Sequence, residues 1–241
     1  MGSIEAGIRG KKAIVTGGTK GIGRSIVSML LEEGAQVVFC GRTQSGVDQA
    51  LEQLRKEQGS DAKVFGQACD VTRAEDIIRF FRYSDDSLTS LDILVNNAGI
   101  GIFRPVAEMT PEDWERVIAT NLTGVFHFSR LALERFRRNG SGFVVNISSL
   151  AAKNTFAGGA AYNASKFGLN GFAEAMMLDH RRENIRVCSV MPGSVSTEFG
   201  GGLADWKVQP EDVAAVVRMV LTMPERTMVS QVEMRPSKPM K

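Results

Sequence analysis

The segment from Lys12 to Leu30 constrains the fold more than any other part of the chain. It begins with KAIVT at residues 12–16, a short run rich in β-forming residues, and continues into T-G-x-x-x-G-x-G, with glycines at 17, 21 and 23. A helical pattern follows, with apolar side chains at Ile22, Ile26, Met29 and Leu30. Glycine permits tight turns and a close approach of phosphate to the backbone, and a helix N-terminus attracts anions. Strand, glycine loop and helix together predict a dinucleotide-binding unit.

The alternation of strand and helix continues along the chain. Apolar runs typical of strands lie near residues 12–16, 36–40, 63–69, 91–95, 143–149, 185–191 and 229–234. Helical patterns lie near residues 21–33, 44–58, 73–83, 111–138, 160–183 and 210–223. Thr72 and Glu75 have the spacing of a capping box, and Pro111 and Pro210 stand where helices are expected to begin. We therefore predict one α/β domain over residues 1–241, a Rossmann fold with a doubly wound, seven-stranded parallel sheet and helices on both faces.

Composition excludes several classes of protein. With 241 residues, 43% hydrophobic and 23% charged, the chain has the composition of an ordinary globular domain. A net charge of +2 gives no basis for nucleic-acid binding, and no apolar run approaches the ~20 residues that span a bilayer. The N-terminus has no secretory signal pattern, and Cys40, Cys69 and Cys188 are interpreted as buried thiols. These features predict a cytoplasmic protein with no nucleic-acid or membrane partner.

Tyr162 and Lys166 are the strongest candidates for chemistry. They stand four residues apart in a helical pattern, so both side chains would lie on one helix face. A lysine cation beside a phenol favours the phenolate and would lower the pKa of Tyr162. The pair would then be a plausible acid and base for a carbonyl or an alcohol. A solvated helix face is the alternative interpretation of this spacing alone.

Further motifs accompany this pair in a fixed order. N-N-A-G at residues 96–99 follows a predicted strand, and a lone Asn121 comes next. Ser149 precedes Tyr162 by thirteen residues, and P-G at residues 192–193 follows a later strand. With the glycine loop, these motifs cover nearly the whole chain and resemble the short-chain dehydrogenase/reductase family. The resemblance implies an NAD(P)-dependent oxidoreductase acting on a carbonyl or alcohol.

The resemblance also assigns roles to individual positions. Tyr162 would protonate the substrate oxygen, Lys166 would hold the nicotinamide ribose and Ser149 would bond the carbonyl oxygen. Asn121 would anchor a water that connects Lys166 to solvent. Ser148 is a competing serine, but the spacing to Tyr162 selects Ser149. The positions expected to contact the cofactor are Thr16, Gly17, Thr19, Lys20, Gly21, Ile22, Gly23, Arg42, Asp70, Val71, Asn97, Ala98, Gly99, Tyr162, Lys166, Pro192, Gly193, Val195 and Thr197.

Charge predicts which nicotinamide cofactor binds. NAD-dependent enzymes of this architecture usually carry an acid at the end of the second strand, where this chain has Gly41 followed by Arg42. Lys20 in the glycine loop adds a second cation. The 2′-phosphate is a dianion that arginine can hold with a bidentate fork. We therefore expect NADPH or NADP, with NAD less favoured and a merely solvated Arg42 as the alternative.

The substrate is expected to be a neutral or acyl carbonyl compound, because the loops after the strands are apolar. The apolar loop residues are Ile100, Ile102, Phe103, Ala151, Ala152, Phe156, Met191 and Phe199, of which about half are equally well explained as core. Residues 194–208 are expected to form a short, mobile lid. The motif set is most similar to 3-oxoacyl-carrier-protein reductases, which implies a β-ketoacyl thioester on a carrier protein or CoA.

Several alternatives stay open. Arg130, Arg135, Arg137 and Arg138 would dock an acidic carrier or would simply be solvated at a helix end. The tail at residues 231–241 lacks the V-N-G-G block of the carrier-protein reductases and is similar to that of general NADPH carbonyl reductases. An NAD(P)-dependent alcohol or polyol dehydrogenase and a non-catalytic nucleotide-binding regulator are the other candidates. The resemblance implies a homodimer or homotetramer paired through the helices near 111–138 and 160–183. No metal site is expected, and His127 is interpreted as a core residue.

Overall fold

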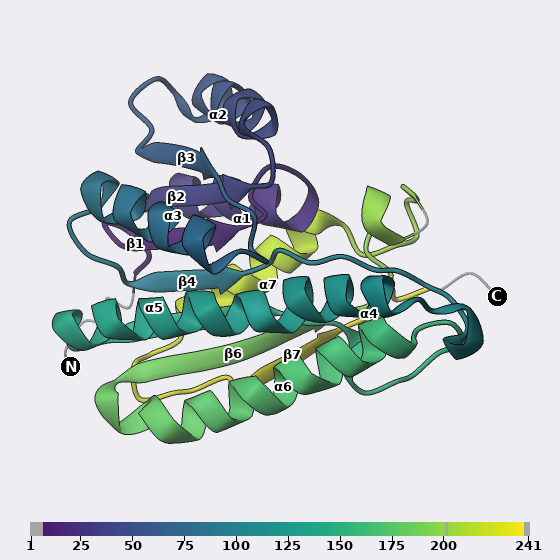
Figure 1. Cartoon of the computed structure of the whole chain (residues 1–241). Helices are drawn as coiled ribbons and strands as arrows, with labels where there is room; N and C mark the ends of the chain where they lie inside the picture. Colours follow the sequence, from purple (N-terminus) through teal and green to yellow (C-terminus); the bar gives the residue numbers. More distant parts are fainter. Residues whose placement is uncertain (1–6, 201, 239–241) are drawn as a thin grey trace.

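Seven parallel strands form one sheet in the order β3-β2-β1-β4-β5-β6-β7 (Figure 1). The computed structural model describes residues 7–200 and 202–238, so residues 1–6, 201 and 239–241 of the predicted domain lie outside the described residues. The strands are β1 (Lys12–Thr16), β2 (Gln36–Gly41), β3 (Val64–Ala68), β4 (Ile93–Asn96), β5 (Gly142–Ile147), β6 (Ile185–Pro192) and β7 (Gln231–Met234). The order reverses between β1 and β4, which confirms the predicted doubly wound sheet.

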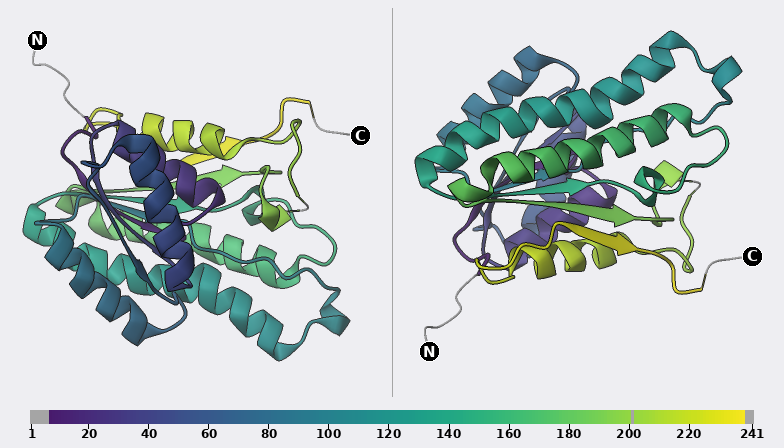
Figure 2. Two further views of the ribbon diagram at one scale, coloured as in Figure 1. Left: turned by 90° about the horizontal axis from the view of Figure 1, so that it is seen from above. Right: turned by 90° about the horizontal axis from the view of Figure 1, so that it is seen from below.

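Helices cover both faces of the sheet (Figure 2). They are α1 (Gly21–Glu32), α2 (Gln44–Gln58), α3 (Ala74–Ser87), α4 (Pro111–Ile118), α5 (Gly124–Asn139), α6 (Ala160–His180) and α7 (Pro210–Leu221). Helices α1, α2 and α7 pack on one face, and α3, α5 and α6 pack on the other. The helix predicted near residues 111–138 is interrupted, because a π-helical turn at Ala119–Thr123 joins α4 to α5. In the described part of the chain, no helix has the length and apolar character needed to cross a membrane.

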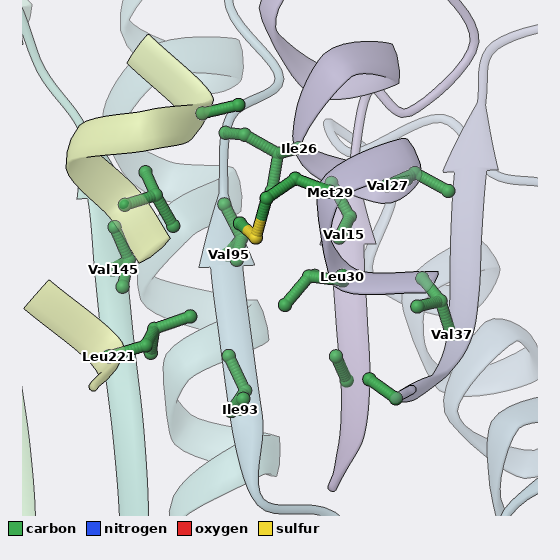
Figure 3. Close-up of a cluster of buried hydrophobic side chains, with 14 of the residues drawn as sticks. Val15, Ile26, Val27, Met29, Leu30, Val37, Ile93, Val95, Val145 and Leu221 are labelled. Carbon is green, nitrogen blue, oxygen red and sulfur yellow. The ribbon is translucent and has the colours of Figure 1, made fainter. Parts of the chain in front are cut away.

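Two apolar layers hold the helices to the sheet. Val15 of β1 and Val95 of β4 are fully buried beneath Ile26 and Leu30 of α1, and Leu221 of α7 joins the same layer (Figure 3). The opposite layer contains four fully buried aromatic side chains, Phe80, Phe81, Phe128 and Phe136, of which the first three contact one another edge-to-face or at a tilt. Burial of a large apolar side chain contributes about 1.5–3 kcal/mol, so these layers fix the strand ends in place.

Local details differ from the sequence predictions in two places. The capping box at Thr72 is wrong, because Thr72 donates both its amide and its hydroxyl to Oδ1 of Asp70, at 2.9 and 2.7 Å. This turn competes with capping, and α3 begins only at Ala74. The predicted core position of His127 is also wrong, since its ring is half-buried beside the exposed Phe126. The three cysteines are buried free thiols, as predicted.

Candidate active site

The predicted site residues follow the carboxyl ends of six different strands. The glycine loop follows β1, Arg42 follows β2, Asp70 and Val71 follow β3, and residues 97–99 follow β4. Ser149 follows β5, and residues 193–197 follow β6. Because parallel strands end at the same edge of a sheet, these segments meet at one edge, where ligands bind in open α/β sheets.

The glycine loop is shaped by close backbone approaches. Gly17 and Gly21 have φ angles of +67° and +56°, in the left-handed region that favours glycine. A Cβ atom at Gly23 would lie 2.2 Å from the carbonyl oxygen of Gly17 and 2.4 Å from Nδ2 of Asn97. The Asn97 amide in turn donates to the carbonyl oxygens of Thr16 and Gly17, at 2.9 and 3.1 Å. The loop is therefore held in one shape before any ligand arrives.

Thr16 connects β1 to the segment after β4. Its hydroxyl oxygen accepts hydrogen bonds from the backbone amides of Asn97 and Ala98, at 2.9 and 3.0 Å. Much of the hydrogen-bonding capacity of these three residues is thus used inside the protein. Their contribution to ligand binding is to fix the floor of the site.

The first turn of α1 is suited to a phosphate group. No side chain caps this N-terminus, and the first turn contains no acidic residue. The backbone N–H groups at the start of a helix and its dipole both favour anions. The bare glycine surface and the uncapped turn together fit the pyrophosphate of a dinucleotide, as the sequence predicts.

The end of β2 has no room for an acidic side chain. A Cβ atom at Gly41 would lie 2.4 Å from Cγ2 of Thr19 and 3.3 Å from a methyl group of Val47. The next residue, Arg42, is exposed and makes no ion pair among residues 7–200 and 202–238. Its guanidinium is therefore available to an anion.

Lys20, the second predicted phosphate ligand, already has a partner. Its Nζ donates to Oε2 of Glu198 across 2.5 Å, and both side chains are largely exposed. This contact lowers the pKa of the Glu198 carboxyl, because the Lys20 cation bonds to it. The two residues are 178 positions apart, so no local sequence signal predicts their pairing.

Asp70 and Val71 lie in the loop between β3 and α3. The carboxylate of Asp70 is bonded to Thr72, as described above, and so shapes its own turn. The carbonyl oxygen of Val71 would lie 2.5 Å from a Cβ atom at Gly124, the first residue of α5. The structure therefore places this loop against the start of α5, close to the π-helical turn.

Asn121 lies in the π-helical turn Ala119–Thr123 and is completely buried. Its Oδ1 accepts from the amide of Ile100 at 2.8 Å, and its Nδ2 donates to the carbonyl oxygen of Ile100 at 2.9 Å and to Oγ of Ser165 at 3.0 Å. Gly99 packs beside it, since a Cβ there would lie 3.3 Å from Asn121 Oδ1 and 3.9 Å from Lys166 Nζ. Asn121 thus joins the segment after β4 to α6, and π-helical turns often occur at functional sites.

Tyr162 and Lys166 share the inner face of α6, as predicted, and the exposed-face alternative is wrong. Tyr162 is 8% and Lys166 4% exposed. Lys166 Nζ donates to the carbonyl oxygen of Ile147 at 2.9 Å and lies 5.8 Å from the centre of the Tyr162 ring. Burial lowers the pKa of Lys166 to about 8.

The pKa of Tyr162 differs from the sequence prediction. Burial raises the pKa of the phenol, and a side-chain hydrogen bond with Ser149 lowers it by a smaller amount. The predicted lowering by Lys166 is therefore wrong for this structure, because the loss of water around the phenol outweighs the favourable contacts. The phenol is protonated at neutral pH and so is a proton donor.

Ser149 faces the site, whereas the competing Ser148 is buried and its hydroxyl has no hydrogen-bond partner in the described structure. Ser149 Oγ accepts from the amide of Ala151 at 3.1 Å. The loop is also tied to α6, because Asn163 Nδ2 donates to the carbonyl oxygen of Ala151 at 2.7 Å. The spacing argument for Ser149 is thus supported by its position.

The segment after β6 lies over both ends of the site. A Cβ atom at Gly193 would lie 2.4 Å from Leu150 Cδ1, beside Ser149, and one at Gly21 would lie 3.3 Å from Thr197 Cγ2. Isolated backbone bridges join Val195 to Val208 and Thr197 to Gly202. Of the predicted lid at residues 194–208, residue 201 lies outside the described residues. The lid begins next to Gly193, which packs on Leu150 beside Ser149, and reaches the glycine loop at Thr197.

The predicted apolar loop residues divide into three groups by exposure. Ala151, Ala152 and Met191 are buried, in agreement with the core interpretation. Phe103, Phe156 and Phe199 are exposed by 47%, 46% and 44% and lie near Tyr162. Ile100 and Ile102 are half-buried.

The arginines considered for carrier docking lie at the opposite edge of the sheet. Asn139, at the end of α5, donates to the carbonyl oxygen of Leu91 just before β4 begins, and Figure 1 shows the long helix of α4 and α5 running away from the lid. Arg135 and Arg137 are already paired with Asp85 and Glu183.

Sequence reasoning missed three positions that support the site. Ser165 bonds to Asn121, Asn163 bonds to the Ser149 loop, and Glu198 pairs with Lys20. Thr19 was expected to contact the cofactor, but its packing against Gly41 was not predicted. Asn163 and Ser165 lie between Tyr162 and Lys166, so small polar side chains in that turn were an available signal. Thr19 and Glu198 act through contacts that only the folded chain reveals.

Comparisons with known proteins agree with this geometry. The sequence model of the family described as "short chain dehydrogenase" matches residues 11–208. The chain is 36% identical to a 3alpha-hydroxysteroid dehydrogenase of Mediterraneibacter gnavus, over 84% of this chain and 81% of the relative. It is 33% identical to a 3-oxoacyl-(acyl-carrier-protein) reductase of Vibrio cholerae, over 82% and 79%.

Solved structures give the same result. A metagenomic short-chain oxidoreductase in complex with NADP superposes with a TM-score of 0.84 and 32% identity, covering 96% of this chain and 99% of the other. Actinorhodin polyketide ketoreductase with NADPH superposes with a TM-score of 0.87 and 30% identity, covering 98% of each chain. The chain therefore belongs to the short-chain dehydrogenase family of oxidoreductases.

Proposed function

We propose that the protein is an NADPH-dependent reductase that converts a ketone to an alcohol. The observation that carries the proposal is the buried pair of Tyr162 and Lys166, with Ser149 bonded to the Tyr162 hydroxyl, at the edge where the glycine loop lies. The raised pKa of Tyr162 keeps its proton in place at neutral pH. A group that holds its proton can give it to a developing alkoxide, as the reduction of a ketone requires.

NADPH is the cofactor that the residues fit best. The glycine loop and the uncapped start of α1 would hold the pyrophosphate, and Arg42 and Lys20 would hold the 2′-phosphate. Thr19 fills the place of the acidic side chain that an NAD-dependent enzyme would use. The NADP and NADPH bound to the two structural relatives support this choice. When bound, NADPH supplies the hydride that reduces the carbonyl carbon.

The protein's own side chains handle the substrate oxygen and its proton. Ser149 Oγ–H would donate to the carbonyl oxygen and stabilise the charge that builds there. Tyr162 would transfer its hydroxyl proton to the same oxygen. Lys166, with a pKa of about 8, is mostly cationic at pH 7 and would stabilise the phenolate left behind. Asn121 fixes the segment at Gly99 and Ile100, and we assign it the anchoring of the water that would reprotonate Lys166.

The finer substrate assignment is a β-ketoacyl thioester. The reductase of Vibrio cholerae named above and a putative ketoacyl reductase of Streptomyces coelicolor, 36% identical over 83% of this chain and 78% of the relative, support it. The position of the arginines supports a CoA or other small thioester over one delivered by a carrier docked at α5. A general carbonyl reductase is the second candidate, because exposed phenylalanines border Tyr162.

The proposal extends to assembly and location. Phe126 on α5 and Phe167 and Leu178 on α6 are exposed by 44%, 45% and 54%, so these helices suit the proposed homodimer or homotetramer. Sedimentation as a monomer at micromolar concentration would contradict this assembly.

The proposed location is the cytoplasm. Three buried free thiols are consistent with the reducing environment of the cytoplasm.

NADPH oxidation with acetoacetyl-CoA, measured beside NADH, tests the proposed function. NADPH-selective turnover is the expected result and supports the β-ketoacyl assignment. Tight NADPH binding without turnover of this thioester would contradict the finer assignment, and a panel of simple ketones would then test the broader one. NADH used as well as NADPH would contradict the assignment of Arg42 and Lys20.

A further inference from the structure

Two phenylalanines from separate loops contact the ring of Tyr162, and a third, from another loop, contacts one of these two. Phe103 lies between β4 and α4, Phe156 between β5 and α6, and Phe199 in the lid. The ring centre of Phe103 is 5.6 Å from that of Tyr162, in an edge-to-face arrangement, and the ring centre of Phe199 is 5.7 Å away. Phe156 contacts Phe103 at 5.6 Å rather than Tyr162 itself.

The backbone beneath the rings is shaped to receive them. A Cβ atom at Gly101 would lie 2.6 Å from Cζ of Phe103 and 3.1 Å from Cζ of Phe199, so both rings converge over this glycine. A Cβ atom at Gly159 would lie 2.7 Å from the ring of Phe156. The rings therefore rest on bare backbone at two places, which defines their positions more closely than exposed loop side chains usually allow.

Phe103 and Phe199 expose apolar ring surface that a bound apolar ligand would remove from water. Phe103 and Phe199 are 47% and 44% exposed, while Tyr162 between them is 8% exposed. The rings thus cover the catalytic phenol and present their own faces to solvent. An apolar surface at the entrance to a reactive group is typical of a site that receives an apolar ligand.

Charged neighbours of the three rings are already neutralised. Arg104, next to Phe103, pairs with Asp113 at 3.0 Å, and Glu198, next to Phe199, pairs with Lys20. Lys153, near Phe156, pairs with Glu233 at 2.6 Å. The entrance is therefore aromatic in character and gives little attraction to a charged substrate.

We propose that Phe103 and Phe199 form an aromatic clamp that selects ketones with a flat apolar ring beside the carbonyl group, with Phe156 supporting Phe103. Such a ring would pack against the exposed faces of the two phenyl groups and bring its carbonyl oxygen to Tyr162. Offset and edge-to-face contacts with both rings would favour a flat ring over an open chain. This inference rests on the proposed ketone reduction and, at the same site, favours the general carbonyl reductase candidate over the β-ketoacyl thioester assignment.

The test compares two neutral ketones, bicyclic α-tetralone and open-chain ethyl acetoacetate, with NADPH. The wild-type protein is expected to have the higher kcat/KM for α-tetralone. Phe103→Ala and Phe199→Ala should each lower the ratio of the two kcat/KM values about tenfold, and Phe103→Leu should lower it less. Ile78→Ala is the control, because Ile78 is a large apolar side chain, 43% exposed, on α3, which contributes neither to the clamp nor to the proposed subunit contact. An unchanged ratio in both alanine variants would overturn the clamp.

Binding of α-tetralone, measured by calorimetry in the presence of NADP, separates the clamp from the reaction. NADP binding by each variant shows that it has folded. Weaker α-tetralone binding in Phe103→Ala and Phe199→Ala supports the clamp, whether or not the protein reduces any ketone. A failure to reduce any ketone would contradict only the proposed function. Turnover of ketones with equal α-tetralone binding in all variants would contradict only the clamp.

Discussion

The ammonium of Lys166 donates to the carbonyl oxygen of Ile147 over 2.9 Å, at the buried end of β5. This bond fixes the long side chain beside the ring of Tyr162, but it does not replace the water that a cation loses on burial. Because burial removes this water, the charged form is disfavoured and the pKa of Lys166 is lowered to about 8. A residue that opposes folding in this way is retained for its chemistry.

Replacing Lys166 with methionine is expected to abolish reduction and to stabilise the fold at neutral pH. Below about pH 8 the lysine is protonated in both folded and unfolded chains, so the folded protein carries the full cost of a buried cation. Between about pH 8 and the ordinary value of 10.5, the unfolded chain binds more protons than the folded one, and wild-type stability rises with pH. The variant should therefore gain about 1–3 kcal/mol at pH 7 and lose this advantage towards pH 10.5.

Urea unfolding at pH 7 and at pH 10 measures this difference. Lys56→Met is the control, because Lys56 is exposed on α2 and should change stability by less than about 0.5 kcal/mol. A Lys166→Met variant that is less stable than wild type at pH 7 would contradict the argument from burial.

Tyr162→Phe should lower kcat for ketone reduction by roughly 10²–10⁴-fold, because the only change is the loss of the hydroxyl proton donor. NADPH affinity and thermal stability should stay close to wild type, since the ring and its packing remain. The chain has two tyrosines, and Tyr83→Phe on α3 is the matched control. Because the pKa of Tyr162 is raised above 10.0, wild-type reduction should not decline through loss of this proton until the pH exceeds 10.0. Substantial turnover by Tyr162→Phe would refute the proposed role.

The sequence was sufficient to predict the fold, because its signals are local. The apolar runs, the glycine loop and the prolines at the starts of α4 and α7 each depend on neighbouring residues, and the structure has strands and helices where these signals predicted them. The π-helical turn at Asn121 was not predicted. It depends on hydrogen bonds from Asn121 to Ile100 and Ser165, which are 21 and 44 positions away.

The site was predictable in its residues but less so in its energetics. The spacing of Tyr162 and Lys166 correctly placed both side chains on one helix face, yet the direction of the Tyr162 pKa was predicted wrongly. Spacing reports which charges are near, whereas desolvation depends on every atom packed around the phenol. Arg135 and Arg137 show the same limit, because the fold, not local charge, brings them to Asp85 and Glu183, their ion-pair partners.

Arg42→Ala should weaken NADPH binding by roughly 10–100-fold and leave NADH binding nearly unchanged, since only NADPH carries the 2′-phosphate dianion. Fluorescence titration of both cofactors measures the two affinities. Arg226→Ala, a change at another exposed arginine beyond α7, is the control for net charge. Equal weakening of NADH and NADPH by Arg42→Ala would indicate a structural role for Arg42 in place of phosphate recognition.

Glu198→Gln should strengthen NADPH binding, because Glu198 holds the cation that we assign to the 2′-phosphate. The pair is exposed, so the gain should be modest, about two- to fivefold, and should shrink at high salt. Glu57→Gln is the control, since Glu57 is an exposed acid paired with Arg24 on the outer side of α1. The carboxylate of Glu198 and the 2′-phosphate of NADPH would compete for the ammonium of Lys20. In a Lys20→Met background this ammonium is absent, so Glu198→Gln should no longer change NADPH affinity. If Glu198→Gln instead weakened NADPH binding, the carboxylate would be acting to position Lys20 for the phosphate, and the lid would be part of the cofactor site itself.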